Sequence, residues 1–197
     1  YGKLALLCII TLSINEGITN NRKQLGKQAV QAYQAASLQY PFMRFRFSSL
    51  KPNLLGPLQS YTGYGGYLFP FTGEAQVDFY PPAFVLPYTV AHEMAHQQGF
   101  GSESEANLIG YLACRASSNV AFKYSAYTQL QAYALQELWL RDSVQAKMYR
   151  LNMPERVVRD RKQLRAYYED RQSLSQPLLN WVYNLFLIQN NQPDGLA

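Results

Sequence analysis

The chain has 197 residues, of which 48% are hydrophobic and 16% charged, a composition typical of a folded domain with one substantial core. It excludes an intrinsically disordered protein. The formal net charge is +5, but the basic residues do not form the aromatic-interleaved clusters of nucleic-acid-binding proteins, so we expect no nucleic-acid partner. Cys8 and Cys114 are too few for a disulfide framework, and we expect both to be buried thiols.

The first 40 residues predict helices. The apolar run over residues 4–14 follows roughly helical spacing and is too short to span a bilayer, so we favour a core helix there over the alternative, the tail of a membrane anchor. Because the chain begins with Tyr1 rather than Met, we also expect a targeting or transmembrane segment upstream of it.

Residues 41–80 predict a small sheet. Apolar residues alternate with arginines over residues 43–47, as in a half-buried strand. The stretch that follows is rich in glycine, proline and aromatic residues, and it divides into strands near 66–71 and 74–79 joined by a turn at Thr72-Gly73. We therefore expect a small antiparallel sheet.

A helix is predicted over residues 88–98. Pro87 suits its start, because the missing N–H of proline would be unpaired there in any case. Gly99 is a typical residue to end it. Helical spacing of apolar residues then continues to the end of the chain, with prolines near the expected helix starts.

The predicted helix carries the only two histidines of the chain, His92 and His96. Positions four apart lie on one face of a helix, so both imidazoles can bind one metal ion, and this geometry suits zinc. Glu93 follows the first histidine directly and is placed to deprotonate a zinc-bound water as a general base.

The same His-Glu-x-x-His spacing also occurs by chance in helices that bind no metal, so an ordinary buried helix is the alternative. Both histidines of the chain fall in the motif, and two further glutamates follow it within residues 102–107. A core helix has no use for such a set of ionisable side chains. We therefore favour a zinc site.

A catalytic zinc site needs three protein ligands and an open position, and without a third histidine the third ligand must be a carboxylate. Glu103 and Glu105 are the near candidates, but they diverge by about 200° on a helix, so only one can face the ion. Ser102 and Glu105 have the spacing of a capping box, which gives Glu105 a local role. We assign Glu103 as the ligand, keep Glu105 as the alternative, and assign Asn107 to orient a ligand histidine.

Three segments carry a wider resemblance: YTGYGGYLFPFTGEAQVDF, LPYTVAHEMAHQQGFGSESEANLIGYLAC and FKYSAY. They resemble the bacterial family DUF3810 over most of the chain, and the resemblance implies a membrane-anchored zinc peptidase. The element Glu103-x-x-Ala106-Asn107 is also similar to the Glu-x-x-Ala-Asp/Asn element of gluzincins, whose first glutamate is the third ligand. It departs from them in spacing, since only six residues separate His96 from Glu103.

The chain is therefore expected to form one α+β, zincin-like domain over residues 1–197, with the small antiparallel sheet packed on the active-site helix. We expect N-terminal helices over 1–40, the sheet over 41–80, active-site helices over 88–118 and a helical body over 119–197.

Zinc peptidases of this general type align an extended substrate along an edge strand beside the active-site helix. The candidate is the strand that begins Glu74, Ala75, Gln76 and Val77. An ordinary edge strand with a polar outer face is the alternative.

The oxyanion of a peptidase reaction needs a hydrogen-bond donor near the metal, and tyrosine is a usual one. Tyr124 and Tyr127 are the candidates. The alternative is that they belong to the edge of the core, as most tyrosines do in a chain with sixteen of them.

These features predict a zinc-dependent metallopeptidase that acts on a peptide or protein substrate, with Zn2+ as cofactor and Glu93 as general base. A non-catalytic, zinc-stabilised subunit or scaffold of a bacterial membrane complex is the alternative. Residues 141–171 carry nine basic and five acidic side chains, which indicates either solvated helix faces or contact with an anionic membrane surface. The family resemblance implies association with a bacterial membrane.

Overall fold

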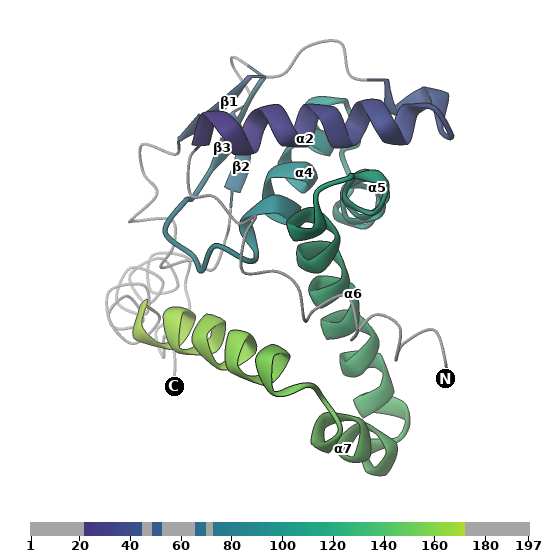
Figure 1. Ribbon diagram of the computed structural model, residues 1–197, viewed down its shortest axis with the longest axis vertical. Helices are drawn as coiled ribbons and strands as arrows, with labels where there is room; N and C mark the ends of the chain where they lie inside the picture. Colours follow the sequence, from purple (N-terminus) through teal and green to yellow (C-terminus); the bar gives the residue numbers. More distant parts are fainter. Residues whose placement is uncertain (1–21, 45–48, 53–65, 70–72, 172–197) are drawn as a thin grey trace, which may run out of the picture.

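The computed structural model describes residues 22–44, 49–52, 66–69 and 73–171, and it shows a small sheet packed against helices at one end and further helices that extend away from it (Figure 1). In chain order the elements are α2 (Arg22–Ser37), the short 3-10 helix η2 (Pro41–Met43), β1 (Leu50–Pro52), β2 (Gly66–Phe69), β3 (Glu74–Val77), α4 (Leu86–Gln97), α5 (Glu103–Ala116), α6 (Val120–Arg141), α7 (Ser143–Leu151) and a last helix over residues 155–171. A helical majority with a small sheet agrees with the predicted α+β class. The predictions for residues 4–14 and for Cys8 lie outside the described residues.

The sheet has the strand order β1-β3-β2. Strands β2 and β3 pair antiparallel, with Gly66 opposite Val77, and Gly73 lies in the turn between them with a φ of +65°. Strand β1 pairs parallel with β3, with Leu50 opposite Ala75. The sheet is therefore mixed, and the expectation of an antiparallel sheet is wrong for β1. A tight turn forces its two strands to run antiparallel, whereas the longer connection after β1 leaves that direction free.

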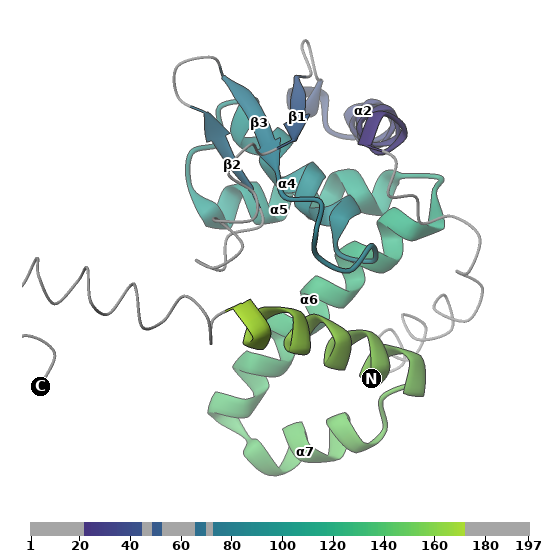
Figure 2. The same cartoon turned by 90° about the vertical axis from the view of Figure 1, so that its left-hand side faces the viewer.

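Helix α4 lies between the sheet and α5, and α2 packs against both helices (Figures 1 and 2). Most of the α4 side chains are buried, among them Val90, Ala91, Met94 and Ala95. The side chains of α4 that are partly exposed, both histidines among them, are all polar, as expected of a helix whose apolar sides are covered by other elements. This central position fixes the backbone of the helix that carries both histidines.

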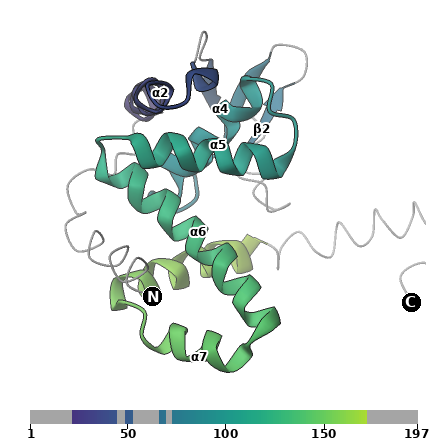
Figure 3. The ribbon, with the colours of Figure 1, turned by 90° about the vertical axis from the view of Figure 1, so that its right-hand side faces the viewer.

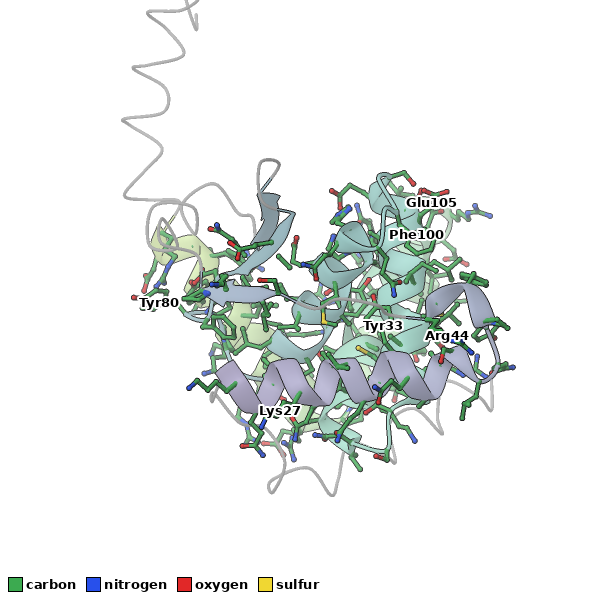
Figure 4. The ribbon with its side chains drawn as sticks, turned by 90° about the horizontal axis from the view of Figure 1, so that it is seen from above. Lys27, Tyr33, Arg44, Tyr80, Phe100 and Glu105 are labelled. Atoms are coloured by element: carbon green, nitrogen blue, oxygen red, sulfur yellow. The ribbon has the colours of Figure 1, made fainter. Side chains whose placement is uncertain are left out.

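Helix α2 supplies one wall of this core. Its buried side chains recur at helical spacing and are Leu25, Ala29, Ala32, Tyr33 and Ala36. The small alanines allow close approach, and the Tyr33 hydroxyl donates a hydrogen bond to the carbonyl oxygen of Ala91 at 2.6 Å. Figure 4, which views the molecule from above, labels Tyr33, a residue of α2. The bond joins α2 to the turn of α4 that precedes His92.

The second half of the described chain extends away from the sheet, as Figure 3 shows for α6 and α7. A smaller cluster of Phe84, Tyr124 and Val157 joins α6 and the last helix to the segment before α4. The Tyr167 hydroxyl also donates to Asp78 Oδ2 at 3.2 Å, which ties the last helix to the end of β3. The predicted helical body is present as far as residue 171.

Three further expectations can be compared with the structure. A strand was expected over residues 43–47, but Met43 is the last residue of η2, because Pro41 favours the first turn of a helix. Most of the remaining residues of 43–47 lie outside the described residues. Cys114 is buried and has no disulfide partner among the described residues, as expected. No helix in the described part of the chain is long and apolar enough to cross a membrane.

Candidate metal centre

The two histidines lie on one face of α4. Their Nε2 atoms are 3.2 Å apart, and both side chains are largely covered. Helix α4 has a proline in its first turn and ends at Gln97, and Gly99 then adopts a φ of +99°, a backbone conformation that glycine tolerates without strain. This change of chain direction brings the start of α5 near the two histidines.

Glu103 is the first residue of α5, and its carboxylate reaches both histidines. Oε2 is 3.2 Å from the Nε2 of His92, and Oε1 is 3.5 Å from the Nε2 of His96. The Glu103 side chain is 77% exposed, so its position is set by these polar contacts rather than by packing. Two adjacent helices thus bring two nitrogen donors and one oxygen donor together.

Glu105 has a different role. The Ser102 hydroxyl accepts a hydrogen bond from the Glu105 N–H at 3.3 Å and donates to Glu105 Oε2 at 2.8 Å. Ser102 therefore caps α5 as predicted, but the Glu105 carboxylate accepts from the Ser102 hydroxyl rather than from the Ser102 backbone N–H, as it would in a full capping box. The Glu105 side chain lies at the outer rim of the molecule (Figure 4). Of the two candidate carboxylates, the structure brings Glu103 to the histidines.

The tautomer of His96 follows from its second ring nitrogen. Nδ1 lies 2.8 Å from the carbonyl oxygen of Phe100, and a carbonyl only accepts, so Nδ1 carries the proton. In the neutral ring Nε2 is then unprotonated, and its lone pair faces His92 and Glu103. A metal-binding histidine requires this tautomer, held by a backbone carbonyl on the other nitrogen.

The three donor atoms can be tested against the geometry of zinc. Zinc binds imidazole nitrogen and carboxylate oxygen at about 2.0–2.2 Å, so the corners of its tetrahedron lie about 3.3 Å apart. Here the two Nε2 atoms are 3.2 Å apart, Glu103 Oε2 is 3.2 Å from the Nε2 of His92, and the other carboxylate oxygen, Oε1, is 3.5 Å from the Nε2 of His96. The two imidazole nitrogens therefore have the spacing of two corners of such a tetrahedron, and the Glu103 carboxylate, which contacts both, supplies oxygen donors beside them.

The chain also matches a known family. The model of the family described as protein of unknown function DUF3810 matches residues 7–197. The chain belongs to this family. No curated protein and no solved structure gives a significant match to it. The description of DUF3810 assigns no activity, so any function must be argued from the site itself.

Asn107 lies beside His92 in this DUF3810 member. Burial, followed by the nearby His96, lowers the pKa of His92, while Glu103 and the Asn107 side chain oppose the shift. His92 is therefore neutral at neutral pH, as a zinc ligand must be. Its buried Nδ1 has no hydrogen bond of ordinary geometry to any described residue.

Tyr88 is a site residue that the sequence analysis missed. Its hydroxyl donates to Asn107 Oδ1 at 3.0 Å, and its ring lies 6.3 Å from the His92 imidazole. Burial raises the pKa of this phenol, so it remains a neutral donor. The one signal in the sequence is its position four residues before His92, which places both side chains on the same face of α4.

Glu93 points from α4 toward the sheet. Its side chain is 4% exposed, and its Oε2 has no hydrogen-bond partner among the described residues. Burial, followed by the charge of Glu103, raises the pKa of this carboxyl to about 8. A Cβ at Gly66 would lie 2.7 Å from Glu93 Cγ and 2.7 Å from the Gln76 carbonyl oxygen, so only glycine fits on β2 at this point.

A second glycine sets the spacing of the two helices. A Cβ at Gly110 of α5 would lie 3.1 Å from the backbone nitrogen of His92 and 3.2 Å from its Cα. The helices therefore cross at closest approach beside a proposed ligand. Neither glycine was singled out from the sequence, because the reason for each lies in a contact with a distant segment.

The two predicted oxyanion donors are not part of this cluster. The Tyr124 hydroxyl donates to Asp160 Oδ2 at 2.5 Å, and its ring packs on Phe84. Tyr127 packs against Tyr111 of α5. Both lie on α6 and pack on elements of the helical body and α5, as the alternative interpretation had it. Tyr88 is the tyrosine that lies next to the histidines.

The predicted substrate strand must also be corrected. Residues 74–77 form β3, which is the central strand, so its backbone is paired on both sides and cannot add an extended peptide. Ala75 and Val77 are buried, Gln76 is half-buried, and Glu74 accepts a hydrogen bond from the Ser49 hydroxyl at 3.1 Å. Strand β2 lies at the edge of the described sheet and is the strand that touches Glu93.

Proposed function

We propose that this chain is a zinc-dependent metallopeptidase with a zincin-like site. The observation that carries the proposal is the cluster of His92, His96 and Glu103, in which two imidazole nitrogens 3.2 Å apart both contact one carboxylate, a donor set that suits zinc. Three protein ligands leave the fourth position open, which is the arrangement of catalytic rather than structural zinc sites.

Zinc bound by these residues would lower the pKa of a coordinated water and polarise the scissile carbonyl. Glu93 has the role of accepting the proton of that water and delivering it to the leaving amine. Its place next to His92 in α4, against the backbone of β2, restricts the carboxyl to a few positions. Tyr88 orients His92 through Asn107 rather than touching the substrate.

An extended peptide would pair with β2, the outer strand of the described sheet, which passes directly beside Glu93. A peptide added there would run past both the acid and the histidines. The substrate is accordingly a peptide or an unfolded segment of a protein. With the family resemblance, we place this activity at a bacterial membrane.

A non-catalytic, zinc-stabilised subunit of a membrane complex remains the second candidate. The observation that favours it is the near-complete burial of Glu93, since a general base must reach a water molecule. In that case the metal would stabilise the junction of α4 and α5, and Glu93 would be a buried neutral carboxyl.

Replacement of Glu93 by glutamine separates the two candidates. E93Q preserves size and removes the base, so a peptidase retains its zinc and loses peptide cleavage by about 100-fold or more. Zinc content is measured by atomic absorption, and cleavage with a mixture of peptides of varied sequence. A zinc-loaded wild-type protein that cleaves no faster than E93Q would favour the structural role.

A further inference from the structure

The end of the helical body distant from the sheet carries an unusual surface. On α7, Val144, Met148 and Leu151 share one helix face and are 71%, 58% and 82% exposed, whereas Ala146 on the opposite face is fully buried. Leu140, at the end of α6, adds a fourth side chain that is 76% exposed. A surface helix normally turns its apolar face inward, so α7 is oriented the opposite way. We call these four residues the α7 patch.

Positive charge borders the α7 patch. Lys147 and Arg150 are exposed on the same nine-residue helix, which contains no acidic residue. The nearest acid, Asp142, caps α7 by accepting a hydrogen bond from the Gln145 N–H at 2.9 Å. Lys147 also places its ammonium 6.0 Å from the ring centroid of Trp139, which is itself partly exposed. Apolar side chains, a tryptophan and lysine or arginine thus lie together.

We infer that α7 and the end of α6 form a docking surface for an anionic lipid bilayer, with the α7 patch inserted below the headgroups and Lys147 and Arg150 in contact with them. Helices that lie in the membrane interface combine large aliphatic residues and tryptophan with flanking lysine and arginine. Interfaces between proteins are depleted of lysine in their cores, so a protein partner or a second copy fits this composition less well. The long side chains keep their charges at headgroup level while the apolar residues are buried.

The surface is independent of the metal centre. Figures 1 and 3 show α7 at the end of the molecule opposite to α2 and α5, so a bilayer that binds α7 leaves α4 and α5 on the far side. Binding to lipid therefore requires neither zinc nor the carboxylate of Glu93. An inactive or metal-free variant is expected to bind vesicles as the wild type does.

Vesicle sedimentation with the 197-residue chain tests the inference. Wild-type protein is expected to sediment with vesicles of equal parts phosphatidylglycerol and phosphatidylcholine, to bind pure phosphatidylcholine weakly, and to dissociate as salt rises. The triple variant L140S/V144S/L151S changes only well-exposed side chains, so it should fold normally by circular dichroism. Its partition coefficient should fall at least about tenfold.

Two further variants complete the test. K147Q/R150Q should weaken binding to the anionic vesicles about tenfold or more without changing binding to neutral ones. L38S removes a leucine that is 89% exposed after α2 and should bind like the wild type. The inference is overturned if the triple variant binds as tightly as the wild type, or if L38S loses as much binding. Light scattering gives a third test. If the wild type is a dimer that binds no lipid and the triple variant is a monomer, the α7 patch is a dimer interface and the inference is overturned.

Discussion

Glu103 is the side chain on which the proposed metal centre depends most directly. It alone of the three donors is exposed, and it is held near the histidines only through its polar contacts. Replacing it by glutamine keeps the shape but removes the negative charge that compensates the ion. We expect E103Q to lower zinc affinity by at least about 100-fold, more than is usual for the loss of an outer partner. Competition with a chromogenic chelator measures this affinity.

Glu105 provides the matched control. It lies two residues away, is also exposed, and faces the cap of α5 rather than the histidines. Glutamine can replace glutamate in a capping box, so E105Q should retain both zinc affinity and stability. Equal losses of affinity in E103Q and E105Q would contradict the assignment of Glu103, rather than Glu105, as the third ligand.

Glu93 gives the metal-free protein a characteristic pH dependence. Its pKa rises from the ordinary value of 4.5 to about 8 in the folded state, first through burial and then through the charge of Glu103. Between these values the folded state keeps a proton that the unfolded state has lost, so the free energy of unfolding decreases as pH rises. The full effect has an upper limit of about 4–5 kcal/mol. Urea unfolding in EDTA at pH 5 and pH 8 should show this decrease in wild type and a smaller one in E93Q.

At the residue scale, spacing along the chain predicts that His92 and His96 share one helix face beside Glu93, and the predicted cap at Ser102 favours Glu103 over Glu105 without excluding Glu105. Both depend on local helix geometry, which a sequence encodes directly. The further residue that lies next to both His92 and Asn107 could not be identified from spacing. Tyr88 was one tyrosine among sixteen, and only its hydrogen bond to Asn107 distinguishes it from the others.

At the element scale, the crossing of α4 and α5 decides whether the donors from the two helices meet. G110A tests that crossing, because the added methyl group would press on the backbone of His92 at 3.1–3.2 Å. We expect the free energy of unfolding to fall by about 1–3 kcal/mol despite the better helix propensity of alanine. Zinc affinity should fall as well, since the shift separates His92 from Glu103. Calorimetry measures both quantities.

The control for this change is G101A. Gly101 lies in the connection between the same two helices, has no positive φ, and a Cβ there would meet nothing within 4 Å. Its replacement should alter stability by no more than about 0.5 kcal/mol. A G101A effect as large as that of G110A would mean that the connection, rather than the helix crossing, determines the spacing.

Strand order is the element-scale feature that the sequence predicted incorrectly. The pattern of β2 and β3 was sufficient for a hairpin, because turn residues and alternation are local. The same local pattern contains no information on β1, which is distant in sequence and pairs with the side of β3 that faces away from β2. That pairing moved β3 to the centre and left β2 beside Glu93, so the candidate substrate strand changed from one to the other.

At the scale of the whole molecule, zinc should bind the folded chain and not the unfolded one. The three donors meet only when α4 and α5 are packed, so binding adds to the free energy of unfolding. At a zinc concentration about 100-fold above Kd, the gain of about 2.7 kcal/mol corresponds to a rise in Tm of roughly 5–10 °C. Differential scanning fluorimetry with zinc or EDTA measures the shift. H96A should show none, and an equal shift in H96A would place the zinc elsewhere.

By itself, the sequence determined the family, the helix with both histidines, the hairpin of β2 and β3 and the predominance of helix, and it narrowed the third carboxylate to Glu103 or Glu105. Apart from the family, which rests on motifs along most of the chain, these properties follow from residue types and spacings within single helices or one hairpin. Only the tertiary structure decided the burial of Glu93 against Gly66, the place of Tyr88 beside His92, the order of the strands and the outward-facing side of α7. Each of these depends on which distant surfaces pack together, and packing is a property of the assembled chain that no local pattern contains.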